Sequence, residues 1–161
     1  MTRKTLTLTA AAALVACAVC GIALRETRAT PPTAGFTATG IAGPALLGPI
    51  DSKAETDDWE IEIRSKGQSE VFFTHIKLAP GAHGGWHSHP GPSIIAVKSG
   101  TATFYDDCFD FEPLDFPAGT GFVEDADCVH LLVNEGDVDC EVIVMQIVPR
   151  GAPRRIDEPA P

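Results

Sequence analysis

Basic side chains are scarce in this sequence of 161 residues, which has 12 lysines and arginines against 22 aspartates and glutamates. The imbalance is larger after residue 29, because residues 30–161 carry eight basic and 21 acidic side chains, a net charge of −13. A surface of that sign repels phosphate backbones and anionic lipid headgroups. The composition therefore argues against a nucleic-acid partner.

Helical periodicity is also missing, since no stretch after residue 30 keeps an apolar period of 3.6 residues over three turns. Short strand-like segments recur instead about every ten residues, separated by Gly, Pro and Asn turn signals. They lie at residues 36–41, 59–63, 71–78, 93–98, 101–105, 121–123, 129–133 and 141–148. This pattern predicts one all-β domain, a closed barrel or a sandwich of antiparallel strands. By itself it does not distinguish an immunoglobulin-like sandwich from a jelly roll.

Cysteines are few, and their number after the first 30 residues is odd. Cys17 and Cys20 lie near the N-terminus, which leaves Cys108, Cys128 and Cys140 for the folded domain. Three thiols allow one disulfide and one free cysteine, and the sequence does not choose the pair. By period-two counting, Cys128 and residue 130 point to the same face of a strand. Cys128 is therefore either a buried or disulfide-bonded cysteine, or a side chain that approaches a site at residue 130.

The first 29 residues predict export. Arg3 and Lys4 precede an apolar run over residues 6–24, which is the order of a signal sequence. Three alternatives follow: cleavage after Ala29, an uncleaved membrane anchor through residues 6–24, or a lipobox ending at Cys17. All three place the domain outside the cytoplasm. We therefore expect a signal peptide or anchor (1–29), an arm (30–56), a barrel (57–150) and a proline-rich tail (151–161).

Three histidines in strand-like segments are candidate metal ligands. His87 and His89 lie two residues apart, so in a strand both side chains point to the same face. His130 lies in another strand-like segment, which ends at the turn signal after Asn134. Neutral imidazole is the commonest metal ligand among protein side chains. Together the three predict a site with three nitrogen ligands.

The spacing of these residues resembles the two motifs of the cupin superfamily. The first motif, G-x5-H-x-H-x3/4-E-x6-G, is matched by Gly81, His87, His89 and Gly100. The second, G-x5-P-x-G-x2-H-x3-N, is matched by Gly119, His130 and Asn134, with Asp125 and Asp127 in place of the proline and the second glycine. The resemblance implies a small jelly-roll barrel that carries its metal ligands inside.

The sequence departs from the first motif at the acidic ligand, where Ser93 (or Ile94 under the longer spacing) replaces the glutamate. We therefore expect a site with less negative charge, whose fourth position is left to water or substrate. Ser93 and the loop residue His83 are further candidate ligands.

The expected cofactor is one divalent transition ion, with Fe, Mn, Ni, Cu and Zn all compatible with imidazole ligands. A site with open positions suits a metal-dependent enzyme, such as an oxygenase or isomerase acting on a small organic molecule. The alternative is a non-catalytic barrel that binds a metal or a small ligand, because one fold hosts both functions. A small-molecule partner is expected in either case, and a homodimer is an alternative to a monomer.

Overall fold

The computed structural model describes residues 28–161, and in this range it consists almost entirely of antiparallel strands, as predicted. The elements are β1 (Phe36–Leu47), β2 (Asp51–Thr56), β3 (Trp59–Arg64), β4 (Ser69–Leu78), β5 (His87–Ser88), β6 (Ser93–Ser99), β7 (Thr101–Asp106), the 3-10 helix η1 (Asp107–Phe109), β8 (Leu114–Pro117), β9 (Gly121–Glu124), β10 (His130–Val133), β11 (Cys140–Pro149) and β12 (Ile156–Asp157). None of the helices within residues 28–161 is both long enough and apolar enough to cross a membrane.

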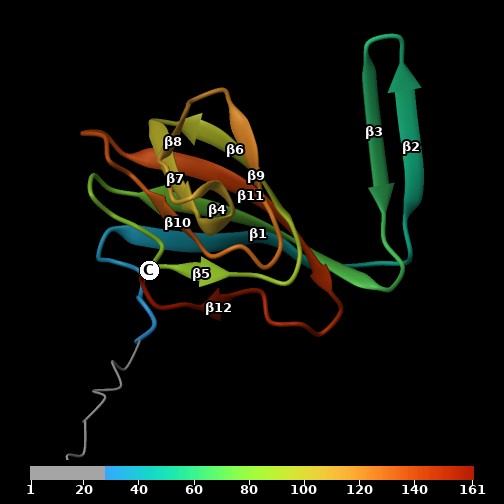
Figure 1. Ribbon diagram of the computed structural model, residues 1–161, viewed down its shortest axis with the longest axis horizontal. Coiled ribbons are helices and arrows are strands. Elements are labelled where there is room, and N and C mark those ends of the chain that lie inside the picture. The colour runs from blue at the N-terminus through green and yellow to red at the C-terminus, as the bar shows by residue number, and fades with distance from the viewer. Residues whose placement is uncertain (1–27) are drawn as a thin grey trace, which may run out of the picture.

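Two five-stranded sheets form a jelly-roll barrel, in the orders β1-β4-β11-β6-β9 and β12-β5-β10-β7-β8 (Figure 1). In the central strands β6 and β11, buried residues alternate with more exposed ones, as the period-two pattern requires. Strand β11 shows this most clearly, because every second residue from Cys140 to Val148 is buried. The core between the sheets takes residues from both of them. It contains Leu78, Ile95, Val97, Ala102, Phe104, Leu132, Cys140, Val142 and Val144.

Strands β2 and β3 pair only with each other and form a hairpin that projects from the barrel (Figure 1). Its turn contains the boundary expected between the arm and the barrel. The alternating segment 59–63 does form a strand, but its apolar side does not reach the core, since Trp59 is 55% and Ile63 43% exposed. An isolated two-stranded sheet has no second layer to cover that side.

One strand from the expected arm and one from the expected tail pair with barrel strands. Strand β1, in the arm, is longer than the 36–41 segment and forms the edge of one sheet by pairing with β4. In the tail, β12 pairs with β5, which places Asp157 opposite His87. The Thr30 amide also donates to the Glu158 carbonyl. Residues 1–27, which hold nearly all of the expected signal or anchor, lie outside the described part of the chain.

Candidate metal site

The pairing of β5 with β10 brings two of the candidate histidines together. His87 and His130 are direct partners in this antiparallel pair, so their side chains lie on the same face. Their ring centroids are 4.4 Å apart, and the ring of His89 lies 4.7 Å from that of His130. His89 and His130 are fully buried, while His87 is partly buried. The structure thus gathers three imidazoles that are up to 43 residues apart in the sequence.

Nδ1 of each of the three rings donates to a backbone carbonyl. Nδ1–H of His87 donates to the Gly85 carbonyl at 2.9 Å, and Nδ1–H of His130 donates to the Cys128 carbonyl at 2.9 Å. His89 donates in the same way to Gly91, at 2.6 Å. A carbonyl oxygen can only accept, so each proton is fixed on Nδ1 and Nε2 faces the cluster. Metal-binding histidines are commonly oriented in this way, by a hydrogen bond from the ring nitrogen that does not bind the metal.

The acidic group missing from the first motif is supplied by Glu124. This residue ends β9 and lies directly opposite Ser93 on the neighbouring strand β6. Its Oε2 is 3.0 Å from Nε2 of His89 and 3.8 Å from Nε2 of His130. The expectation that the cluster lacks a carboxylate was therefore wrong. The carboxylate lies on the strand next to Ser93, so the spacing within the first motif does not reveal it.

Ligand atoms of His89, Glu124 and His130 lie within 4.8 Å of one another, close enough to share one ion. Nε2 of His130 has no hydrogen-bond partner within residues 28–161, although the residue is 0% exposed. A buried polar atom without a partner costs free energy, and a bound ion is one of the ordinary explanations. The predicted ligand His87 is not part of this group of ligand atoms, although its ring centroid lies 4.4 Å from that of His130. Ser93 Oγ lies 3.3 Å from Nε2 of His89.

Charge in the cluster is concentrated on one pair. Burial disfavours the charged form of His89, but the Glu124 carboxylate outweighs it and raises the pKa of His89. Burial likewise opposes ionisation of Glu124, yet the hydrogen bond from His89 and the charges of the imidazoles lower its pKa. Burial lowers the pKa of His87 to about 3 and also lowers that of His130. Two rings are therefore neutral at pH 7, which is the form that binds metals.

Comparison with known proteins supports the family suggested by the motifs. Residues 74–146 match the model of the cupin domain family, and this range includes all four clustered side chains. Residues 74–146 therefore form a cupin domain. No curated protein shows significant similarity to it.

Several solved structures are similar to parts of this chain. A predicted oxalate decarboxylase from Thermotoga maritima is 26% identical over 52% of this chain and 83% of its own, with a TM-score of 0.43. The Cupin_2 domain of an XRE family transcriptional regulator from Enterobacter cloacae is 17% identical over 72% and 99%, with a TM-score of 0.49. A double-stranded β-helix protein from Klebsiella pneumoniae is 24% identical over 70% and 86%, with a TM-score of 0.46.

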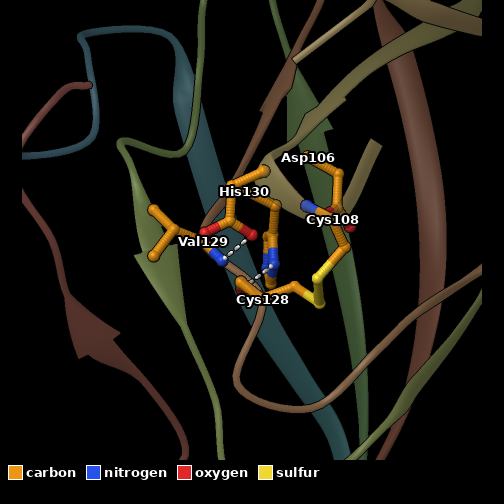
Figure 2. Close-up of a disulfide and its surroundings, with 6 residues drawn as sticks. Asp106, Cys108, Cys128, Val129 and His130 are labelled. Atoms are coloured by element: carbon orange, nitrogen blue, oxygen red, sulfur yellow. Dashed lines mark hydrogen bonds between the residues drawn. A yellow bond between two sulfur atoms is a disulfide. The ribbon is translucent and has the colours of Figure 1, made fainter. Parts of the chain in front are cut away.

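A disulfide supports the His130 end of the cluster (Figure 2). It joins Cys108, in η1 after β7, to Cys128, two residues before His130. Figure 2 shows the Cys128 carbonyl accepting from the His130 ring beside this bond. Of the two alternatives for Cys128, the structure shows the disulfide, and Cys140 is left free and buried. The covalent link therefore restrains the backbone that orients a candidate ligand.

A cavity of about 280 Å³ adjoins the cluster and is lined by His87, His89 and Glu124. Apolar side chains from both sheets form other parts of its wall; they include Phe36, Ile76, Leu132 and Val144. Arg154 and Arg155 from the C-terminal tail line it as well. An apolar cavity with a few convergent polar groups is typical of a small-molecule site. The two arginines could not be predicted as cavity residues, because the tail contains no sequence motif.

Two other residues named from the sequence have structural roles. His83 lies outside the group of ligand atoms, and its Nδ1 accepts a hydrogen bond from the Gly85 amide, which puts the ring proton on Nε2. Asn134 is fully buried and ties its turn together. Its amide donates to the carbonyls of Leu78 and Val138, and its Oδ1 accepts from the Gly136 amide.

Proposed function

We propose that this protein binds one divalent transition ion through His87, His89, His130 and Glu124, and that the ion meets a small organic molecule in the adjoining cavity. The observation that carries the proposal is the bare Nε2 of His130, fully buried and 3.8 Å from a carboxylate oxygen. An ion between the rings and Glu124 would give that atom a partner. It would also take the place of the proton that His89 shares with Glu124.

Each side chain has a defined task in this proposal. The three imidazoles supply Nε2 lone pairs because backbone carbonyls hold their Nδ1 protons. Glu124 supplies the negative charge that partly offsets a divalent cation. A six-coordinate ion held by four side chains keeps two positions for water or substrate. When bound, such an ion polarises an oxygen of the molecule beside it or acidifies a bound water.

The donor set does not select one metal. Imidazole suits Fe, Ni, Cu and Zn, whereas a carboxylate also suits Mn. A catalytic version of this site is an oxygenase or isomerase acting on a small organic molecule. The alternative version is a barrel that binds metal or a small ligand without turnover. Within residues 28–161 the only carboxylate of the cluster is Glu124, which would be a metal ligand and therefore not a free acid or base, and this favours the alternative.

Metal analysis tests the site itself. The substitution His130→Asn removes Nε2 but keeps an amide that can donate to the Cys128 carbonyl. We expect protein purified without chelator to contain close to one metal ion per chain, and the variant to lose most of it. The matched control is His75→Asn, because His75 lies outside the cluster, paired with Glu141 at 2.9 Å. Equal metal content in wild type and His130→Asn would reject the proposal.

Turnover assays distinguish the two versions of the site. Protein loaded in turn with Fe(II), Mn(II), Ni(II), Cu(II) and Zn(II) would be tested for oxygen uptake with panels of phenols, thiols and diketones. Uptake that disappears in His130→Asn supports an oxygenase. If no oxygen is consumed, NMR of the same mixtures without oxygen tests isomerisation. Bound metal with no conversion in either assay supports the binding role.

We also propose that the domain is exported. A disulfide between Cys108 and Cys128 suits an oxidising compartment, and residues 1–29 have the order of a signal sequence. Intact mass spectrometry of the protein from its native host separates the alternatives. A chain that begins at Thr30 indicates cleavage, the full mass indicates an anchor, and a lipid on Cys17 indicates a lipoprotein. A full-length chain in the cytoplasmic fraction would contradict export.

A further inference from the structure

Arg154 reaches the cavity from a tail that the sequence leaves without a role. The chain leaves β11 at Pro149, turns, and returns as β12 to pair with β5, the strand of His87. Arg154 lies on this return, just before β12, and lines the cavity together with His87 and Glu124. The β5–β12 pairing therefore fixes a guanidinium in the wall that the candidate metal site also faces.

The guanidinium of Arg154 is held by neutral groups. Nε donates to Oε1 of Gln146 at 3.0 Å, and Nη2 donates to Oγ1 of Thr74 at 3.0 Å. Both partners are buried barrel residues, although Arg154 as a whole is exposed. The guanidinium carbon lies 4.2 Å from the centre of the Phe72 ring. These contacts orient the charge without neutralising it, and they leave the donors of Nη1 for another partner.

Within residues 30–161 Arg154 has no acidic partner, a feature that it shares with Lys66 and Arg150, but of these three it alone lines the cavity. Five other basic side chains in the described range lie within 4.0 Å of a carboxylate: Lys53, Arg64, Lys77, Lys98 and Arg155. Acidic residues outnumber basic ones, so such partners are plentiful. Within residues 28–161, however, no carboxylate forms an ion pair with Arg154. A fixed, unpaired guanidinium in a cavity wall is suited to bind an anion by paired hydrogen bonds.

We propose that Arg154 is the anion-binding residue of this cavity, and that the cavity takes a small carboxylic acid with an apolar body. The carboxylate would pair with the guanidinium, while the body packs against Phe36, Ile76, Leu132 and Val144. This inference deepens the proposed function, because the far end of the same molecule would face the metal cluster. The volume of about 280 Å³ limits the ligand to one small ring or a short chain.

Benzoate and benzamide are suitable probes, because they share size and shape and differ in charge. Their dissociation constants would be measured by ligand-observed NMR, on metal-free and on zinc-loaded protein. A charge-assisted hydrogen bond should make wild-type protein bind benzoate about 10- to 100-fold more tightly than benzamide. Arg154→Gln should bring that ratio close to one, because glutamine can keep neutral contacts with Thr74 or Gln146 but carries no charge.

Two further variants control the interpretation. Arg150→Gln removes an arginine of the same segment that does not line the cavity and bonds Gln68 instead, so it should keep the wild-type ratio. Arg154→Lys keeps the charge but loses the planar pair of donors, so it should keep only part of the preference. Circular dichroism and metal content show whether each variant is folded and loaded.

The outcomes separate this inference from the metal proposal. A preference for benzoate in metal-free protein that Arg154→Gln abolishes supports the anion site even if no metal ever binds. Normal metal content with no preference for benzoate in wild-type protein overturns it and leaves the metal proposal standing. Equal loss of both probes in Arg154→Gln also overturns it, since the arginine would then only hold the tail in place.

Discussion

Exchanging the residues at positions 93 and 124 is the sharpest test of Glu124 as the acidic ligand of the proposed metal site. Ser93 and Glu124 are register partners on β6 and β9, and both point into the barrel. Glu124→Gln removes the negative charge but keeps the shape of the side chain. In the double variant Ser93→Glu, Glu124→Ser, the carboxylate moves to the position that the family motif prescribes. The total side-chain volume is nearly unchanged, which is the kind of core exchange that proteins tolerate best.

The structure sets the size of the expected effects. Glu124 Oε2 lies 3.0 Å from Nε2 of His89, so in the proposed site it is a direct ligand. Loss of a supporting residue outside the ligand shell typically costs 10- to 100-fold in metal affinity. Loss of a charged ligand should reach at least the upper end, about 100-fold, which corresponds to about 2.7 kcal/mol. The exchange variant should recover at least tenfold of this loss, because Ser93 Oγ already lies 3.3 Å from the same nitrogen.

The assay is competition for Zn(II) and Mn(II) against a fluorescent chelator, with urea unfolding of each metal-free protein as the control for folding. Glu124→Gln that binds both ions within about twofold of wild type would refute the role of Glu124. An exchange variant that unfolds like wild type but binds no better than Glu124→Gln would refute the claim that the two positions are equivalent.

Two further predictions concern the backbone around the ligands. The double substitution Cys108→Ala, Cys128→Ala should lower the free energy of unfolding by about 3 kcal/mol, because the disulfide closes a loop with a sequence separation of 20. It should also weaken metal binding. Urea unfolding and metal titration measure the two effects, and no change in either would contradict the prediction. Gly91→Ala should lower the free energy of unfolding by about 1–3 kcal/mol, because a Cβ there would lie 2.0 Å from the Ile147 carbonyl oxygen. The carbonyl of Gly91 itself orients His89. Gly40→Ala, where a Cβ meets nothing within 4 Å, is the matched control, and equal unfolding midpoints for the two alanine variants would contradict the close approach.

The sequence alone predicted the fold class and identified the three histidines as candidate metal ligands. Alternation of apolar residues over short segments is a local signal, so it marks strands without knowledge of their partners. Segments 93–98, 101–105 and 141–148 became β6, β7 and β11 with shifts of at most one residue at either end. The spacing of His87, His89 and His130 is also local to two motifs, and the cupin domain match over residues 74–146 covers both.

Strand pairing decided everything that depends on residues far apart in the chain. Glu124 is 31 positions from Ser93 and faces the same cluster only because β6 and β9 are paired in one register. Period two means that a slip of one residue would turn Glu124 outward, and no pattern within either strand fixes that register. The disulfide between Cys108 and Cys128 depends in the same way on β7 and β10 being neighbours. Arg154 enters the cavity only because β12 returns to β5, through hydrogen bonds of the backbone, which every residue can form and no side-chain pattern announces.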